Sequence, residues 1–216
     1  MQIAFGLYQG FTALDAIGPY QVLTNLPGAE VVLCAERKGE LSDDNGLLRF
    51  QIDASFDDVR EPDVLVVPGG TITRKLARDR APIVEWVEAA HARTTWTTSV
   101  CTGALVLAAA GVLDGRPATT HWIAYDELAG YGARPTEQRV VVDGKVITAA
   151  GVSAGIDMAL TLVGIMAGAE VAQAIQLGIE YDPQPPYDAG APSKAPSEIL
   201  DLVTAVMRAD EERVLG

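Results

Sequence analysis

Short apolar runs rich in valine and isoleucine alternate with segments of helical periodicity along this chain, and no other feature constrains its fold more. This order is typical of an α/β protein in which helices pack around a largely parallel sheet. The runs at 29–35 and 63–70 are almost continuously apolar, as expected of strands that helices cover on both faces. We therefore expect a mostly parallel central sheet with helices on both sides.

The expected elements follow from this alternation and from the turn residues between the runs. The central strands are expected at 3–8, 29–35, 63–70 and 94–100. Residues 47–53 alternate in polarity and suit an edge hairpin, as do residues 138–150 around the Asp143–Gly144 turn. The expected helices cover residues 15–26, 81–93, 102–111, 153–168, 169–178 and 197–213.

Length and charge limit what the chain can do. We expect one domain over residues 1–216, in which a Pro-rich extended segment at 182–197 precedes the final helix at 197–213. The net charge of −13 and the lack of a basic cluster argue against nucleic acid as a partner. The longest apolar stretch, 103–113, is too short to span a bilayer, and the first residues carry no cationic leader. We expect a cytoplasmic protein without a membrane partner.

The most informative stretch surrounds Cys101, which follows a β-branched run and stands directly before a helical segment. Ser99 and Gly103, two residues before and two after it, are small. A nucleophile elbow requires small neighbours there, because its strained strand-to-helix turn pushes one side chain into the open. Ligands of such sheets bind outside the carboxyl ends of the strands, where Cys101 would lie. The alternative is a small buried apolar thiol, which is what we expect of Cys34 inside its strand.

Two backbone features favour a reactive thiol. The helix after Cys101 directs free N–H groups and its dipole toward the sulfur, which is worth up to about 2 kcal/mol. This effect alone would lower the pKa of the thiol from roughly 8.5 toward about 7. Gly69 and Gly70, at the end of the 63–70 run, leave room for N–H groups near a developing negative charge. We expect the backbone N–H groups of Gly70 and Thr102 to orient a bound intermediate or water.

Five stretches together resemble the ThiJ/PfpI superfamily, which has the class I glutamine amidotransferase-like fold. They are LDAIGPYQVL (14–23), VVPGG (66–70), TSVCTGALVLAAAGVLDGRPATTHW (98–122), GVSAGIDMALTL (151–162) and EYDPQPPYDAGAP (180–192). The resemblance implies a flavodoxin-like three-layer α/β sandwich and a homodimer. Within the superfamily, the chain is most similar to bacterial isocyanide hydratases in three of its motifs: the 180–192 stretch, LDxxGP and ATTHW. These enzymes add water to R–N≡C and release an N-substituted formamide.

The resemblance places a catalytic acid at Asp15, where the hydratase branch has an acidic residue beside its cysteine. From the sequence alone, a helix N-cap is the more usual role for such an aspartate, and this alternative stays open. An ionised carboxylate about 4 Å from the Cys101 thiolate would cost about 4 kcal/mol at an effective dielectric near 20. We therefore expect a neutral Asp15 that donates a hydrogen bond to the thiolate, with both groups titrating jointly.

Other site residues are implied by the resemblance alone. Val152 and Ser153 match positions that border the hydratase pocket, and Thr102 is placed to bind the water or Asp15. His121 lies where the superfamily often has a histidine near the site. The ATTHW context does not show that His121 reaches the sulfur, so we prefer a structural or dimer-interface role and keep it as an accessory candidate.

Three functions are compatible with these residues. The leading hypothesis is a cofactor-independent isocyanide hydratase, because the sequence has no metal-ligand spacing, phosphate loop or dinucleotide motif. The second is a glyoxalase or deglycase of the same superfamily, a branch that generally has glutamate where this chain has Asp15. The third is a thiol or small-molecule sensor module related to the amidase-like domains of AraC-type regulators.

Overall fold

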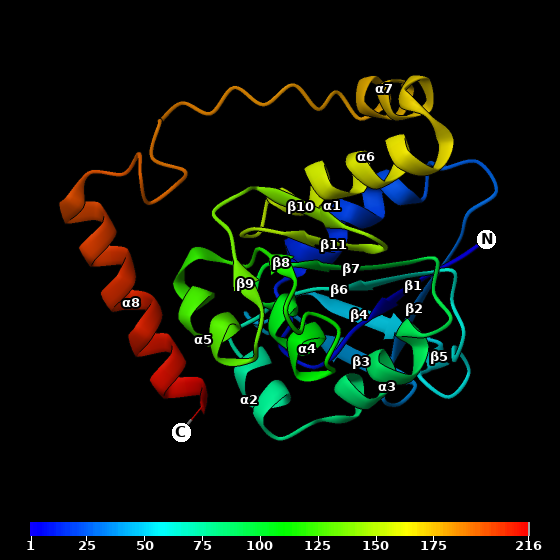
Figure 1. Ribbon diagram of the computed structural model, residues 1–216, viewed down its shortest axis with the longest axis horizontal. Coiled ribbons are helices and arrows are strands. Elements are labelled where there is room, and N and C mark those ends of the chain that lie inside the picture. Colours follow the sequence, from blue (N-terminus) through cyan, green and yellow to red (C-terminus); the bar gives the residue numbers. More distant parts are fainter. Residues whose placement is uncertain (216) are drawn as a thin grey trace.

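The computed structural model describes residues 1–215 and contains a seven-stranded sheet between two layers of helices (Figure 1). The strand order is β10-β11-β7-β6-β1-β2-β5, and every neighbouring pair is parallel except β10 with β11. This mostly parallel sheet confirms the expected fold class. The strands are β1 (Gln2–Gly6), β2 (Glu30–Ala35), β5 (Ala54–Ser55), β6 (Val64–Val67), β7 (Trp96–Val100), β10 (Val140–Asp143) and β11 (Val146–Ala149).

The centre of the sheet is apolar because helices cover both of its faces. All four residues of β6 are buried, and four of the five residues of β1 are buried. The parallel register of these strands sets Ile3 opposite Val64 and Phe5 opposite Val66. Continuous burial removes the need for the polar alternation of a one-sided sheet.

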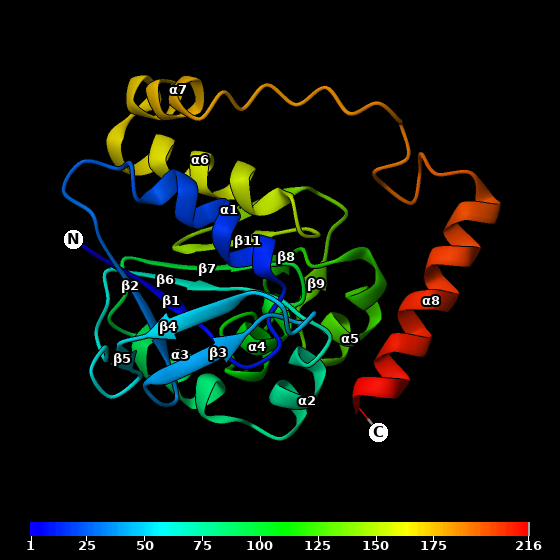
Figure 2. The same ribbon diagram turned by 180° about the vertical axis from the view of Figure 1, so that it is seen from behind.

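The helices form two groups, one on each side of the sheet (Figures 1 and 2). The first group is α1 (Ala13–Leu23), α6 (Ala154–Ala167) and α7 (Ala169–Gly178). The second group is α2 (Thr73–Arg78), α3 (Pro82–His91), α4 (Gly103–Ala109) and α5 (Tyr125–Gly130). The sequence did not predict α2 or α5, each of which has only six residues and too few turns for a clear period.

Two small sheets lie apart from the main one. β3 (Gly39–Ser42) and β4 (Arg49–Ile52) form an antiparallel hairpin, whereas β8 (Pro117–Ala118) and β9 (Arg134–Pro135) form a short parallel pair. Residues 47–53 therefore contribute one strand, β4, to a hairpin, but this hairpin is not part of the central sheet, whose edge strands are β10 and β5. The hairpin at 138–150 is confirmed as β10 and β11.

The C-terminal part leaves the body of the protein. An extended segment follows α7, passes along the outside and leads to α8 (Ser197–Leu215), which lies beside α2 and α5 (Figures 1 and 2). No described residue of α8 is buried, and the helix is held by an Arg74–Glu211 ion pair of 2.7 Å and a Thr71–Asp210 hydrogen bond of 3.2 Å. Within residues 1–215, no helix combines the length and the apolar character needed to cross a membrane.

The parallel arrangement determines where a site can form. β1, β6 and β7 are neighbours in the sheet, so the segments that follow them emerge at one edge. These segments carry Asp15 in α1, the Gly69–Gly70 corner and Cys101. Residues far apart in the chain therefore meet at the carboxyl ends of three adjacent strands, as in other open α/β sheets.

Candidate active site

Cys101 lies in a strained turn that directly follows β7 and precedes α4. Its φ of 56° is in the left-handed region, where a residue with a side chain costs about 1–3 kcal/mol. The surrounding backbone holds the turn, because the Cys101 N–H donates to the carbonyls of Ala149 and Ala150 at 3.1 and 3.0 Å. The Thr120 hydroxyl donates to the Cys101 carbonyl at 2.9 Å. The local fold thus fixes the direction in which the thiol points.

The Cys101 side chain lies in a nearly closed environment next to the backbone at the starts of α4 and α6. Cys101 is 6% exposed. The pKa of the thiol is lowered by the backbone N–H groups of Val152 and Thr102 and by the Thr102 side chain. Val152 itself has a φ of 23°, so a second strained residue lies at this point, just before α6. The two backbone N–H groups favour a negative charge on the sulfur, whereas the Thr102 hydroxyl donates its proton to the Gly70 carbonyl.

Cys34 provides a contrast within the same protein. It lies in β2, is fully buried, and its thiol donates to the Phe5 carbonyl at 3.5 Å. Burial raises the pKa of Cys34 to about 12. Its environment is that of a structural thiol, as the sequence predicts.

Asp15 is a fully buried carboxyl group in the first turn of α1. Its Oδ2 accepts a hydrogen bond of 2.8 Å from the N–H of Gly69, on the loop after β6. The N-cap residue of α1 is Thr12, so the structure excludes the N-cap role that remained open for Asp15. Oδ1 has no partner with good hydrogen-bond geometry among residues 1–215. The carboxyl is therefore turned toward the site and away from its own helix.

Asp15 and Cys101 influence each other's protonation. Burial raises the pKa of Asp15 to about 7, the Gly69 N–H and Cys101 lower it, and Asp44 raises it. Burial and the Asp15 charge raise the pKa of the Cys101 thiol, against the donors around the sulfur. The N–H group at the helix end lowers this pKa, as expected, but burial and Asp15 outweigh it, so the pKa does not approach 7. Two negative charges are disfavoured here, so at most one of the two groups is ionised and the pair titrates jointly.

The glycine corner supports the pair sterically. A Cβ on Gly69 would lie 2.6 Å from the Thr102 nitrogen and 2.7 Å from Asp15 Oδ2, so only glycine fits. The expected role of Gly70 needs correction. Its N–H donates to Thr102 Oγ1 at 3.0 Å, and this hydroxyl donates back to the Gly70 carbonyl at 3.0 Å. Because the N–H is already engaged, Gly70 positions Thr102, and the donors that face the sulfur come from Thr102 and Val152.

Of the three accessory candidates Gly69, His121 and Ser153, the structure places only Gly69 in contact with the pair. The Nδ1 atom of His121 accepts from the Ile123 N–H at 3.4 Å, and its ring packs against Gly151. Burial and Arg74 lower the pKa of His121 to about 4, so the ring is neutral. In the described chain no hydrogen bond links His121 to Cys101, and the exposed Ser153 accepts from Arg139 at 3.2 Å.

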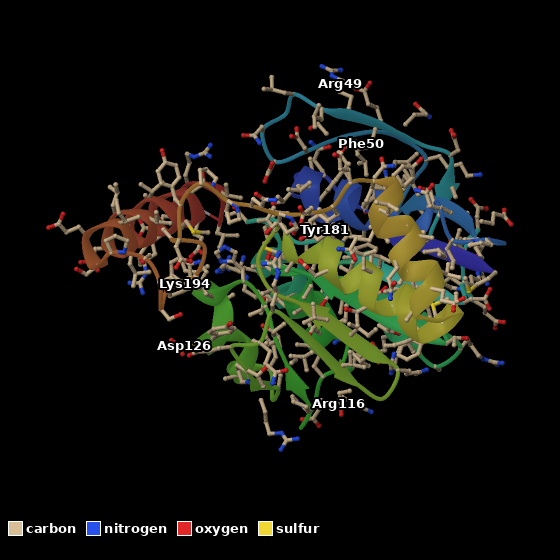
Figure 3. All side chains as sticks on the ribbon, turned by 90° about the horizontal axis from the view of Figure 1, so that it is seen from above. Arg49, Phe50, Arg116, Asp126, Tyr181 and Lys194 are labelled. Atoms are coloured by element: carbon tan, nitrogen blue, oxygen red, sulfur yellow. The ribbon has the colours of Figure 1, made fainter. Side chains whose placement is uncertain are left out.

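A polar cluster on the exposed side fixes the start of α6. Tyr181, which follows α7, lies beside α6 in Figure 3, and its hydroxyl donates to Asp157 Oδ2 at 3.0 Å. Arg139 pairs with the same carboxylate at 2.7 Å. The cluster ties the first turns of α6 to β10 and to the extended segment, and so steadies the turn that carries Val152.

Sequence reasoning missed Tyr8, which follows β1 and is 8% exposed. Its hydroxyl donates to the Pro68 carbonyl at 2.7 Å. Burial raises the pKa of Tyr8 well above its ordinary value, and Asp15 and Cys101 add to this increase. A polar aromatic residue at the carboxyl end of a central strand was the available signal, since that edge of the sheet holds the site.

The described residues offer no metal centre. Within residues 1–215, no three side chains among histidine, cysteine, aspartate and glutamate lie close enough to hold a metal ion. The site consists of a thiol, a carboxyl group of raised pKa and the backbone N–H groups next to them.

The chain belongs to the DJ-1/PfpI family, whose model matches residues 1–164. Isonitrile hydratase from Pseudomonas putida is 42% identical over 201 residues, which cover 93% of this chain and 87% of that protein. Deglycase PfpI from Pyrococcus furiosus is 30% identical over 150 residues, or 68% of this chain and 89% of that protein. A crystal structure of a ThiJ/PfpI family protein from Pseudomonas syringae matches with a TM-score of 0.92 at 38% identity, over 98% of this chain and 87% of that one.

Proposed function

We propose that this protein hydrates isocyanides to N-substituted formamides with Cys101 as nucleophile and Asp15 as acid and base. The observation that carries the proposal is the buried pair itself: a carboxyl group whose pKa is raised to about 7 interacts with a thiol in a strained strand-to-helix turn. We propose that this turn acts as a nucleophile elbow. The likeness to an isonitrile hydratase over 93% of the chain supports the choice of substrate.

The first step uses the single proton of the pair. The terminal carbon of R–N≡C is electrophilic toward a soft thiolate and must gain a proton when sulfur adds. Cys101 Sγ forms the S–C bond while the neutral Asp15 carboxyl protonates the same carbon, which yields a thioimidate, R–N=CH–S–Cys101. The N–H groups of Thr102 and Val152 stabilise the thiolate before attack.

The second step returns the proton. Asp15, now ionised, removes a proton from a water molecule that attacks the thioimidate carbon, and then passes this proton to the nitrogen. The resulting R–NH–CH(OH)–S–Cys101 collapses: the C–S bond breaks, the hydroxyl proton returns to Asp15, and the formamide R–NH–CHO leaves. Water supplies the oxygen and two protons, so the cycle needs no cofactor.

The test is to incubate the protein with cyclohexyl isocyanide and to measure N-cyclohexylformamide by chromatography. We expect product with the natural chain and with Cys34→Ala, which removes the structural thiol, and no product with Cys101→Ser. Full activity of Cys101→Ser would refute the assignment. Formation of lactate from methylglyoxal without formamide would favour a deglycase-like activity, and thermal stabilisation by the isocyanide without turnover would favour a sensor.

We also propose that the active form is a homodimer, as expected from the resemblance. Sedimentation equilibrium at several concentrations tests this directly. A mass of one chain throughout the micromolar range would overturn it.

A further inference from the structure

We propose that Tyr8 is a positioning residue for Asp15 and acts through one peptide group, the Pro68–Gly69 peptide. The hydroxyl of Tyr8 donates to the Pro68 carbonyl at 2.7 Å, and the Gly69 N–H donates to Asp15 Oδ2 at 2.8 Å. The carbonyl of Pro68 and the N–H of Gly69 belong to the same planar peptide unit. The three groups therefore form one chain of hydrogen bonds that ends on the acid of the proposed reaction.

The peptide transmits the effect because its two ends are electronically coupled. A hydrogen bond accepted by the carbonyl increases the polarity of the C–N unit and makes the N–H a stronger donor, so consecutive bonds strengthen one another. The Gly69 N–H favours the ionised carboxylate and lowers the pKa of Asp15. Tyr8 strengthens that donor and thereby limits how far burial raises the pKa.

The surroundings make this relay specific. Tyr8 is 8% exposed, and its ring meets Phe11 edge to face, with centroids 6.4 Å apart, so the position of its hydroxyl is determined by packing. Gly103 packs so closely against the Pro68 carbonyl that an added Cβ would lie 2.7 Å from its oxygen. The next peptide is also held, because the Thr12 N–H donates to the Gly69 carbonyl at 2.8 Å.

Three ionisable groups face this chain of bonds from different elements. Cys101 approaches from the turn after β7, Asp44 from the loop after β3, and Asp15 from α1; all three raise the pKa of Tyr8. The hydroxyl therefore keeps its proton at neutral pH and remains a donor to Pro68. Tyr8 does not touch the reacting atoms in this scheme. Its effect on the pKa of Asp15 does not depend on the proposed function, and only the catalytic consequence of that effect rests on it.

The test measures the ionisation of Asp15 in the free protein, without any isocyanide. The infrared band of the protonated carboxyl, assigned by its absence in Asp15→Asn, is followed against pH. We expect Tyr8→Phe, which keeps the ring and removes the donor, to raise the midpoint by about half a pH unit. The matched control is Tyr20→Phe, because Tyr20 is a 41% exposed residue of α1, the helix that carries Asp15, and we expect no change.

A second substitution predicts the opposite sign and guards against a packing artefact. Replacement of Tyr8 by 3,5-difluorotyrosine makes the hydroxyl a stronger donor, so the midpoint should fall below that of the natural protein. An unchanged midpoint in both variants, or a shift of the same sign in both, would overturn the proposal. If these shifts occur in a protein that forms no formamide, the proposed function fails and the relay stands.

Discussion

Asp15→Asn is the substitution that tests most directly whether the site holds a neutral carboxyl group. The pKa of this group is 3.8 in an unfolded chain and about 7 in the folded protein. Between these values the folded state binds more protons than the unfolded state. Stability from this group is therefore complete below the unfolded pKa and is lost as pH rises toward about 7. Each pH unit within that window costs about 1.4 kcal/mol.

The expected loss of unfolding free energy can be worked out for the part of this pH window that is easy to measure. From about pH 5 to about pH 8, the natural protein should lose about 3 kcal/mol of unfolding free energy through Asp15. The asparagine side chain cannot ionise, so the Asp15→Asn variant lacks this loss while its other groups titrate as before. Urea unfolding of both proteins across this range gives the difference between them. If the two stabilities stay parallel, the pKa of Asp15 is not raised and the proposed division of one charge between the carboxyl and the thiol is wrong.

Three further predictions concern the surroundings of the pair. The imidazole of His121, with its pKa lowered to about 4 by burial and Arg74, should show no NMR titration down to about pH 5, and a midpoint near 6.5 would contradict the structure. Gly103→Ala should destabilise the protein by about 3 kcal/mol or more in urea unfolding, because the new methyl group would clash with the Val67 carbonyl; an unchanged midpoint would show that the turn can relax. Arg74→Met should release α8 and accelerate proteolysis of the extended segment several-fold. The control Arg116→Met, which breaks an ion pair with Asp143 elsewhere in the protein, should not change the rate. Equal rates in the two variants would show that other contacts hold α8.

The sequence was enough to make Cys101 a candidate nucleophile, because the sharp turn that it requires depends on small neighbouring residues. Small residues at 99 and 103 permit a sharp turn, and the φ of 56° shows that the turn is made. The strand-helix alternation was equally local and predicted the central strands and the long helices. The short helices α2 and α5 were not predicted, because six residues are too few to show a helical period.

The protonation of the site depended on contacts between distant segments. The helix end after Cys101 predicts a lower thiol pKa, but burial and Asp15 act in the other direction. The role of Gly70 changed for the same reason, since its N–H meets a hydroxyl 32 residues away in the chain. Neither the depth of burial nor the partner of a given N–H can be read from local spacing.

The order of apolar and helical segments by itself determined a parallel α/β sheet and the edge at which a site would form, because both depend on short-range periodicity and strand direction. Only the tertiary structure decided which groups meet at that edge. Tyr8, Gly69 and Asp15 lie on three separate segments, and their coupling through one peptide exists only when β1 and β6 lie side by side. Desolvation and hydrogen-bond partners are properties of the packed chain, and they set the charge on which the proposed chemistry depends.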